Sequence, residues 1–472
     1  MRAPREPAVA AVFTQGSVLR HVIVMTLTSG AGLMAVFLVD VLSMFYISFA
    51  QRDDWRAAVS LMSKAMFFPY AVNLGLMVGL GTVVSVAVGS GDRSLARRYA
   101  ATGLVVTALV GLIISLGALP WRVDILRLFG AQGEALEVAS RLLALTLPVN
   151  VLLSVGMGCA SIVRAWGDPQ RAMLVSVAGA IATAIADPVF IFGLRQGVDG
   201  VGWAIIVARI VFVAVALWAA VGVHDAVAAP RLPRRSDIAP FAAVAVPAIA
   251  TNLALPFADW FVTRTIWQFG VAASAAAGVY DRIMPFAFSL VIALSGAIGP
   301  IVGQNFGAGA FARVRLAFLH SLMLAAGYGV AVWLVVSAGA PLLVHAFGLS
   351  GGAATFFAFL CRYATLTWVF VGCMLVANAM FNTLGRAYVA TLFTWGRATL
   401  GTIPFVLLGV AYGGAQFAMI GIAVAALLFA LTAVLTADRL TRRLRRGSST
   451  TDAAAFEPRG TLDVPIVLAA DQ

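Results

Sequence analysis

The sequence predicts an all-α polytopic membrane protein with twelve transmembrane helices, arranged as two six-helix lobes related by a pseudo-two-fold axis along the membrane normal. Three observations predict this class. Of the 472 residues, 61% are hydrophobic and only 11% are charged; the mean hydropathy of +0.97 is far above that of soluble proteins. Long apolar stretches recur along the chain, and its two halves resemble each other.

The apolar stretches are each long enough to cross about 30 Å of hydrocarbon as a helix. Turns, arginines and acidic residues separate one stretch from the next. In chain order, the predicted spans are residues 21–50, 57–89, 99–121, 138–163, 172–194, 201–223, 238–269, 272–304, 314–345, 354–384, 387–412 and 415–437.

The charges between the spans predict the orientation. Lys64 is the only lysine, so arginine carries almost all of the net charge of +12. Connections after even-numbered spans are basic, as with Arg97 and Arg98 or Arg234 and Arg235, whereas odd-numbered connections are nearly balanced. The positive-inside rule places the basic connections and both termini in the cytoplasm. We therefore expect a multi-pass protein of a cell membrane, bacterial and inner, whose basic loops face anionic lipid rather than nucleic acid.

An internal repeat relates the two halves. Residues 65–98 can be laid on residues 281–314 with a constant offset of 216, so that Pro69 meets Pro285 and Gly91 meets Gly307. Because six is even, both halves begin on the same side of the membrane and the repeats are parallel. Substrate sites in transporters of this kind lie between the halves.

The repeat and the loop composition define five predicted regions. They are a cytoplasmic N-terminal tail at 1–20, an N-terminal lobe at 21–223, a cytoplasmic inter-lobe linker at 224–240, a C-terminal lobe at 241–437, and a basic and then disordered cytoplasmic tail at 438–472.

The most informative stretch is residues 185–193, which sets Asp187 and Pro188 inside an apolar span. A carboxylate at membrane depth costs about 2.5 to 3.5 kcal/mol, so it is expected to face the bundle interior or a watery cavity and to have a partner. Pro188 removes a backbone donor and weakens the helix at that point. Asp187 is therefore a candidate functional residue.

Two further charges lie in the same half of the chain. Counting 1.5 Å per residue from the nearest charged outer loop places Asp40 about 18 Å deep, and Lys64 and Asp187 each about 12 Å deep. Lys64 has two interpretations. It neutralises Asp40 or Asp187, or it keeps a carboxylate ionised until a substrate or a proton displaces it.

The second half carries charges at comparable depth. Asp259 and Asp281 are each about 16 Å from the turn at Gly270. They and Arg282 are candidates for an ion or substrate site. The alternative is that Asp281 and Arg282 form a local or interhelical structural pair.

Other chemistries lack the residues that they need. The three cysteines have no metal-ligand spacing. The glycine-rich turns at 89–91 and 307–309 follow membrane helices, and Lys64 is not preceded by the glycine of a Walker A motif. We expect no metal, no cofactor and no enzymatic activity, so an ion gradient has to supply the work.

Several short motifs, in order and at matching spacing, carry a resemblance to the multidrug and toxic compound extrusion (MATE) family over roughly residues 17–437. They are VD at 39–40, GSGDRSLARR at 89–98, RAWGDP at 164–169, ADPVFIFG at 186–193, GVDGVG at 197–202 and GQNFGAG at 303–309.

The resemblance implies an antiporter that exports cationic, amphipathic or otherwise varied small molecules, driven by protons or sodium ions. Members similar to the DinF branch use acids in helices 1 and 5, which match Asp40 and Asp187. The predicted ion-coupling set is Asp40, Asp187, Lys64, Thr183 and Asn150. This chain departs from some relatives in having no proline in helix 1, and in having Thr183 where they carry asparagine.

We hypothesise that Asp187 or Asp40 takes a proton from outside because burial disfavours the charged carboxylate. Helices 1 and 5 then repack, and a monomer surrounded by lipid releases its cationic substrate outward. One rival is a flippase for a lipid-linked saccharide from the same superfamily. An intramembrane enzyme is disfavoured, since there is no HExxH pair and the four histidines are dispersed near span ends.

Overall fold

The computed structural model describes residues 11–48, 53–229 and 233–447, and every regular element in these ranges is a helix. The N-terminal part comprises, in chain order, η1 (Val12–Thr14), α1 (Val18–Ser48), α2 (Asp53–Gly89), α3 (Arg93–Ala118), α4 (Arg122–Leu128), α5 (Gly133–Thr146), α6 (Asn150–Ala165), α7 (Pro169–Pro188), η2 (Val189–Gly193), α8 (Asp199–Leu217) and η3 (Trp218–Val223).

The C-terminal part repeats this plan. It comprises α9 (Arg235–Trp267), α10 (Val271–Ala287), α11 (Ser289–Gly307), α12 (Phe311–Ala346), α13 (Gly351–Phe359), η4 (Leu360–Ala364), α14 (Leu366–Thr383), α15 (Ala387–Gly396), η5 (Arg397–Gly401) and α16 (Thr402–Gly447). The helix α9 begins inside the predicted linker 224–240, and α16 continues into the predicted tail 438–472.

The spans agree with the twelve that the sequence predicts. Within the described ranges, ten helical stretches are long and apolar enough to cross a membrane, and α5 with α6, bent by 51°, supplies an eleventh. The stretch Ala387–Arg446 supplies two, because α16 leaves helical geometry at Gly413 and Gly414. Its arms then pack together so closely that a Cβ on Gly409 would lie 2.3 Å from the carbonyl oxygen of Phe417.

Two predicted spans are not single helices. The span 138–163 is bent between α5 and α6, and the structure breaks the span 272–304 at Phe288 into α10 and α11. Pro285 lies one turn before the break, where its missing N–H leaves a backbone carbonyl without its helical donor. Pro69, its partner in the repeat, lies inside the continuous helix α2.

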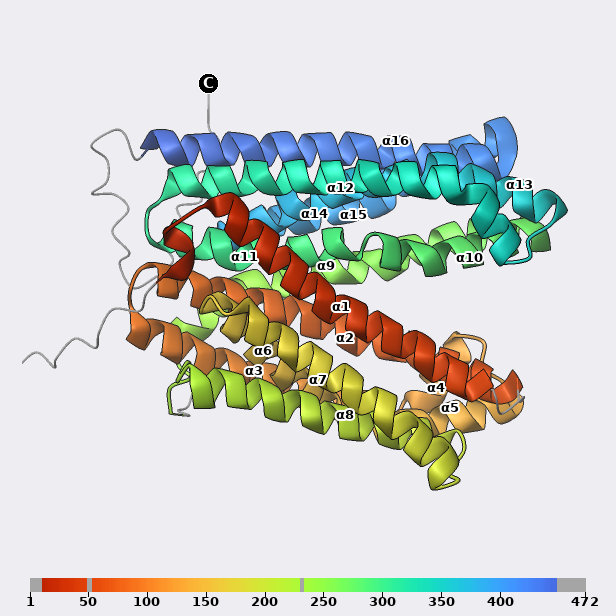
Figure 1. Cartoon of the computed structure of the whole chain (residues 1–472), viewed down its shortest axis with the longest axis horizontal. Coiled ribbons are helices and arrows are strands. Elements are labelled where there is room, and N and C mark those ends of the chain that lie inside the picture. The colour runs from red at the N-terminus through yellow and green to blue at the C-terminus, as the bar shows by residue number, and fades with distance from the viewer. Residues whose placement is uncertain (1–10, 49–52, 230–232, 448–472) are drawn as a thin grey trace, which may run out of the picture.

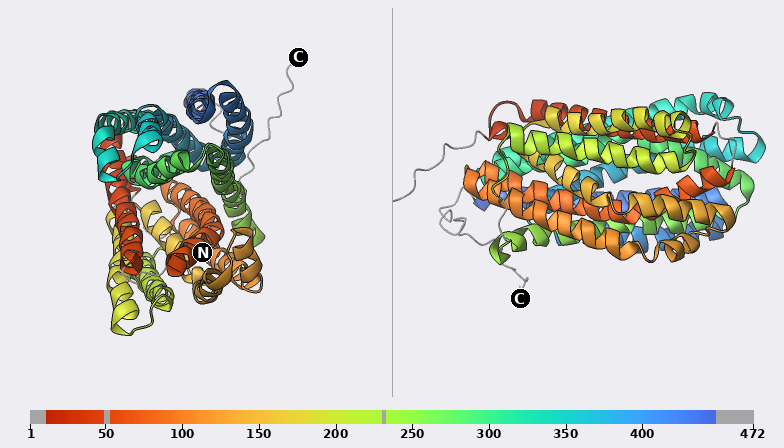
Figure 2. Two further views of the ribbon diagram at one scale, coloured as in Figure 1. Left: turned by 90° about the vertical axis from the view of Figure 1, so that its right-hand side faces the viewer. Right: turned by 90° about the horizontal axis from the view of Figure 1, so that it is seen from below.

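The helices form two lobes, α1 to α8 and α9 to α16, which Figure 2 shows end-on. Both described chain ends lie at one end of the bundle, on the left in Figure 1. We call this the terminal end, and the opposite one the far end. The helix α2 packs along α9, and α1 packs against both α7 and α11, so α1 and α2 carry much of the contact between the lobes.

Two helices at the terminal end begin with matching caps. The side chain of Asp92 accepts a hydrogen bond from the backbone N–H of Leu95 at the start of α3. Asp168 does the same for Arg171 at the start of α7, where Pro169 occupies the first helical position. Such caps satisfy donors that the first turn of a helix leaves free, so these loop sequences fix where α3 and α7 begin.

Candidate functional site

Asp187 lies in the last turn of α7 and is only 1% exposed. Its Oδ2 atom accepts a hydrogen bond from the hydroxyl of Ser43 on α1. Its Oδ1 atom is buried and has no hydrogen-bond partner within the described part of the chain. A buried oxygen without a donor is costly, so this carboxylate is suited to hold a proton or to contact a cation.

Asp40 lies on α1 one turn before Ser43, and its side chain is exposed. It is within electrostatic reach of Asp187 and of Tyr70 on α2. The helices α1 and α7 pack side by side, which brings these two acids together. Two neighbouring carboxylates in one site repel when both are charged, and one shared proton or a cation relieves the repulsion.

The helix changes form directly after Asp187. Pro188 ends α7, and the π-helical turn η2 follows, in which Leu194 donates to the carbonyl of Val189 at 2.8 Å. A π-turn inserts an extra residue into the helix and is frequent at functional sites. The weakening that Pro188 predicts is therefore present next to the acid.

Thr183 and Asn150 do not join Asp187 in the same way. The hydroxyl of Thr183 donates to the carbonyl of Gly179 in its own helix, at 3.0 Å. Asn150 is fully buried, and its side-chain oxygen accepts from Nδ2 of Asn73 on α2 at 3.0 Å. Ser154 donates to Oδ1 of Asn73 at 2.6 Å. The side-chain oxygen of Asn150 is thus bonded to α2, and not to Asp187.

The sequence predicts only one member of this buried network of Asn73, Asn150 and Ser154, namely Asn150. A signal was present in the sequence, since Asn73 and Ser154 are polar residues inside apolar spans, as Asn150 is. A buried amide without a partner is costly, so a polar residue in one apolar span indicates a polar partner in another span.

Lys64 and the acids of the second lobe form a separate group. Lys64 on α2 is exposed and lies within electrostatic reach of Asp259 on α9. Asp259 is in turn within electrostatic reach of Asp281 on α10. The influence of Lys64 thus reaches an acid of the other lobe, although Lys64 and Asp259 form no ion pair in the described part of the structure. Neutralisation of Asp40 or Asp187 by Lys64 stays a prediction. Asp281 and Arg282 form no ion pair with each other in the described part of the structure.

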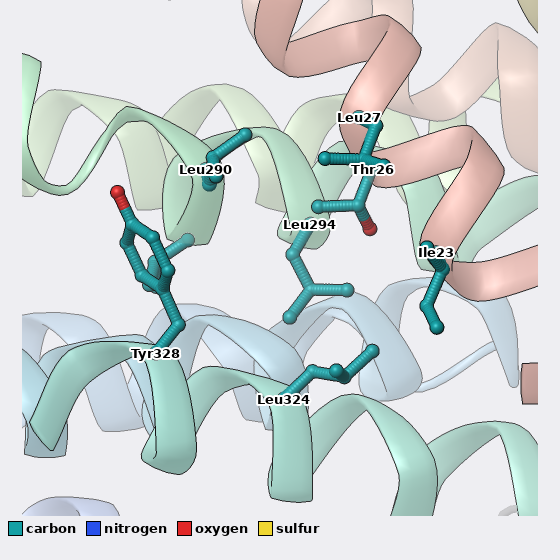
Figure 3. Close-up of a pocket in the computed structure, with 8 residues that line it drawn as sticks. Ile23, Thr26, Leu27, Leu290, Leu294, Leu324 and Tyr328 are labelled. Carbon is teal, nitrogen blue, oxygen red and sulfur yellow. The ribbon is translucent and has the colours of Figure 1, made fainter. Parts of the chain in front are cut away.

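An apolar pocket of about 160 Å³ lies elsewhere, between α1, α11 and α12 (Figure 3). Its walls are mainly aliphatic, with Thr26 and Tyr328 as the polar residues, and Tyr328 donates its hydroxyl to the carbonyl of Ala287 at 2.7 Å. Ile23 in its wall is about 25 Å along α1 from Asp40. The pocket contains no charged side chain and is distinct from the site of the acids.

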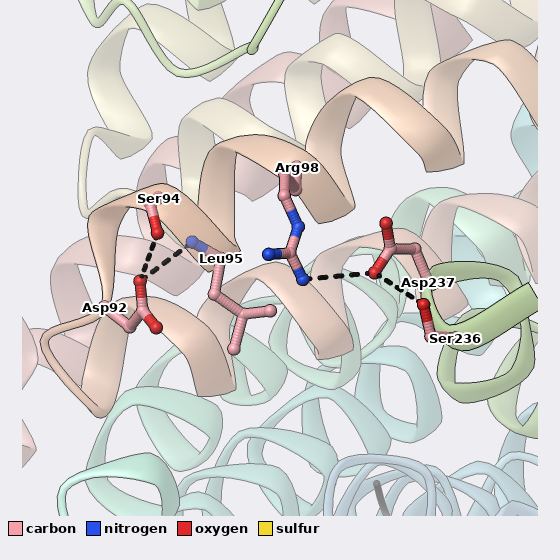
Figure 4. A network of polar contacts seen from close by, with 6 residues as sticks. All are labelled: Asp92, Ser94, Leu95, Arg98, Ser236 and Asp237. Atoms are coloured by element: carbon pink, nitrogen blue, oxygen red, sulfur yellow. Dashed lines mark hydrogen bonds and ion pairs between the residues drawn. The ribbon is translucent and has the colours of Figure 1, made fainter. Parts of the chain in front are cut away.

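Ionic contacts join the lobes at the terminal end. Arg98 of α3 contacts Asp237 of α9 at 3.2 Å (Figure 4). Nearby, the cap residue Asp168 also contacts the side chain of Arg171 and, at 3.1 Å, Nε2 of His224. Burial opposes ionisation of Asp168, but the hydrogen bonds from Arg171 and His224 outweigh it, so the pKa of Asp168 lies below its ordinary value.

Comparison with known proteins adds a family match. The family model described as MatE matches residues 29–189 and 247–408, one segment in each lobe and together well over half of the chain. The multidrug export protein MepA of Staphylococcus aureus is 25% identical over 305 residues, which are 62% of this chain. The chain spans 66% of the length of that relative.

Two further similarities cover more of the chain. A protein named FAD transporter, from Shewanella oneidensis, is 24% identical over 404 residues, which are 83% of this chain and 88% of the relative. A solved structure described as the outward-facing conformation of a multidrug resistance MATE family transporter has a TM-score of 0.87 at 21% identity. It covers 93% of this chain and 100% of its own. At that identity the likeness concerns the fold.

Proposed function

The chain belongs to the MatE family, and from this premise we propose that it is a secondary active antiporter that exports cationic or amphipathic small molecules in exchange for protons or sodium ions. The observation that carries the proposal is the pairing of Asp40 and Asp187 between α1 and α7, with one oxygen of Asp187 free of hydrogen bonds. That oxygen is where the proton or cation would bind.

The coupling step follows from the hydrogen bond between Ser43 and Asp187. With Asp187 ionised, its oxygen accepts from Ser43 and holds α1 against α7. A proton on Asp187, or a sodium ion between the two acids, changes the charge that Ser43 faces, so the contact between α1 and α7 weakens. Thr183 and Asn150 belong to the same lobe as Asp187. In this proposal they are polar groups that support the site of Asp187.

The acids of the second lobe are the proposed binding site for cargo. Asp259 and Asp281 attract a cation, and Lys64 competes for Asp259 from the opposite lobe. Arg282, on the same helix as Asp281, is part of this proposed site. A cargo cation bound at Asp259 would repel Lys64 in the opposite lobe and so affect the contact between the lobes, on which alternating access depends.

The rival cargo is an anionic dinucleotide, because one relative is named a FAD transporter. The charges of the two proposed sites together favour a cation. Asp40 and Asp187 of the coupling site and Asp259 and Asp281 of the cargo site supply up to four negative charges, against the two positive charges of Lys64 and Arg282. A lipid-linked saccharide remains a second rival, and the apolar pocket of Figure 3 would suit its acyl chain.

The test is transport by the full chain in proteoliposomes. We expect efflux of the cationic dye ethidium when a proton gradient alone, or a sodium gradient alone, is imposed, and no movement of FAD. Asp187→Asn should abolish coupled efflux, whereas Asp124→Asn, a change in an exposed acid next to Arg127, should not. Gradient-driven efflux that persists in Asp187→Asn would contradict the assignment of this acid.

The orientation completes the proposal. The basic connection between α2 and α3 and the one before α9 both lie at the terminal end. The positive-inside rule therefore makes this end cytoplasmic. Both termini would then face the cytoplasm. Protease cleavage of a tag fused to the C-terminus, in intact cells and in opened cells, distinguishes the two orientations.

A further inference from the structure

The segment just before α1 is docked into the bundle at the terminal end. Phe13 in the turn η1 is 2% exposed, and both of its backbone polar groups are bonded to α11. Its N–H donates to Oε1 of Gln304 at 2.9 Å, and its carbonyl accepts from Nδ2 of Asn305 at 3.1 Å. This part of the predicted N-terminal tail 1–20 is therefore packed against the second lobe.

The same glutamine also reaches the first lobe. Nε2 of Gln304 donates to the carbonyl of Ala165, in the last turn of α6, at 2.8 Å. The last carbonyls of a helix have no partner within it, so this oxygen needs an outside donor. Gln304 is 0% exposed. One buried amide thus joins the N-terminal segment, the helix α11 of the second lobe and the helix α6 of the first.

Arg313 on α12 holds the segment from its other side. Its guanidinium donates to the carbonyls of Phe13, Gln15 and Gly16 at 2.9 to 3.1 Å. Its Nε atom donates to Oδ1 of Asn305 at 2.9 Å. Arg313 therefore fixes the path of the segment along α11 and α12 of the second lobe with several hydrogen bonds, each to an oxygen that would otherwise need water.

The lobes approach closely beside this cluster. A Cβ on Gly89 of α2 would lie 2.1 Å from the carbonyl oxygen of Gln304, and one on Gly307 of α11 would lie 2.0 Å from the carbonyl oxygen of Val86. Only glycine allows backbones to approach to this degree. The terminal end is therefore closed in this structure, with Gln304 at the centre of the closed face.

We propose that Gln304 and the docked segment of residues 11–17 form a latch that keeps the terminal end closed, and that this latch has to release before that end can open. The inference rests on alternating access, which belongs to the proposed function. Opening would separate Gln304 from Ala165 and, because the segment leads into α1 of the first lobe, would pull Phe13 away from Gln304. A buried amide that loses its partners costs free energy until water reaches it. The latch would thus help to set how often the terminal end opens.

The test measures the opening directly, without transport. Spin labels are attached in a background that lacks Cys159, Cys361 and Cys373, and the full chain is reconstituted in lipid. One pair, Val223→Cys and Leu316→Cys, reports the distance between the lobes at the terminal end, at sites 38% and 45% exposed. A second pair, Leu194→Cys and Phe347→Cys, reports the far end, at sites 57% and 49% exposed.

We expect Gln304→Leu, which keeps the bulk but removes both hydrogen bonds, to lower the ratio of closed to open terminal ends about tenfold. The far-end pair should move in the opposite sense. The matched control is Ser85→Ala, which lies in the same interface but whose hydroxyl donates only to Thr82 in its own helix, at 3.0 Å. The control should leave both distances unchanged.

Arg313→Ala provides a second variant at a less buried site, in case Gln304→Leu does not fold. It removes the hydrogen bonds to the segment and should shift the same distances in the same direction. Folded variants with wild-type distance distributions at both ends would overturn the latch. If the variants shift the distances but the wild type shows no ethidium efflux, the latch is supported and the proposed function is overturned.

Discussion

Ser43 of α1 donates a hydrogen bond to Asp187 of α7, and so joins a helix at the boundary between the lobes to an acid of the first lobe that is only 1% exposed. The carboxylate is a charged acceptor when ionised, which makes this bond stronger than one between neutral groups. The contact between α1 and α7 consequently depends on whether Asp187 carries a proton.

The first prediction concerns this bond. Ser43→Ala should loosen α1 from α7 by about 1.5 to 3 kcal/mol when Asp187 is ionised, and should lower gradient-driven ethidium efflux severalfold. Ser43→Thr keeps the hydroxyl and should retain most of the activity. The measurement is the initial efflux rate in proteoliposomes at equal protein content. Equal rates for the alanine and threonine variants would refute the coupling role of this bond.

The second prediction concerns the charges that face each other across the lobes. Lys64→Ala removes the positive charge near Asp259, so a cationic dye should bind more tightly by about 1 kcal/mol, or about fivefold. Asp259→Asn should weaken binding. Fluorescence titration of purified protein with ethidium measures both effects. Arg127→Ala, an exposed arginine paired with Asp124, is the control, and unchanged affinity in Lys64→Ala would argue against competition by the lysine.

The third prediction concerns the glycine contact between α2 and α11. Gly307→Ala would place a Cβ 2.0 Å from the carbonyl oxygen of Val86, and a backbone atom cannot move aside as a flexible side chain can. We expect a lower unfolding temperature and lobes that separate at the terminal end. Gly327→Ala in α12, where a Cβ would meet nothing within 4 Å, should instead be neutral or stabilise the helix by up to about 1 kcal/mol.

The fourth prediction concerns the cap of α7. Asp168→Ala removes the acceptor for the N–H of Arg171 and should cost about 1 kcal/mol, whereas Asp168→Asn keeps an oxygen at the cap and loses only the charge. Thermal unfolding in detergent measures both changes. Asp92→Ala is the control, because Asp92 caps α3 in the same way but is not the acid that contacts His224. Its effect on the unfolding temperature measures the loss of a cap alone.

The same acid predicts a pH dependence with a defined sign. Because the pKa of Asp168 is lowered on folding, its charge stabilises the protein fully above the unfolded value of about 3.9, and this stabilisation is lost as the pH falls through the lower folded value. The difference in unfolding temperature between the wild type and Asp168→Asn should shrink as the pH falls below about 4. A difference that grows below about pH 4 would contradict this account.

The spans and the burial of Asp187 could be predicted because both follow from the cost of placing polar groups in hydrocarbon. The break at Phe288 could not. Pro69 and Pro285 occupy equivalent positions of the repeat, yet α2 continues through the first and the second lies just before the break between α10 and α11. A proline weakens a helix, but packing around it decides whether the helix ends.

The partners of individual side chains were also beyond the sequence. The depth of Lys64 was estimated from its distance to the outer loop, but depth does not show which direction a side chain faces around its helix. The structure brings Lys64 near Asp259 of the other lobe. In the same way, the polar residues before α1 suggested a tail, and only the position of Gln304 and Arg313 shows why Phe13 is buried.

The hydrogen bonds among Asn73, Asn150 and Ser154 have a consequence for the order of events in a transport cycle. They lie where no water competes for amides, so α2 and α6 should keep one register and turn together as a rigid pair. The helix α1 packs along α7, and within the described residues its side-chain hydrogen bond to α7 is the one from Ser43 to Asp187. Under the proposed function, protonation of Asp187 weakens this bond and allows α1 to move. Under the same proposal, one ion bound at Asp187 would then shift α1 without deforming α2 and α6, and so start the movement of a whole lobe.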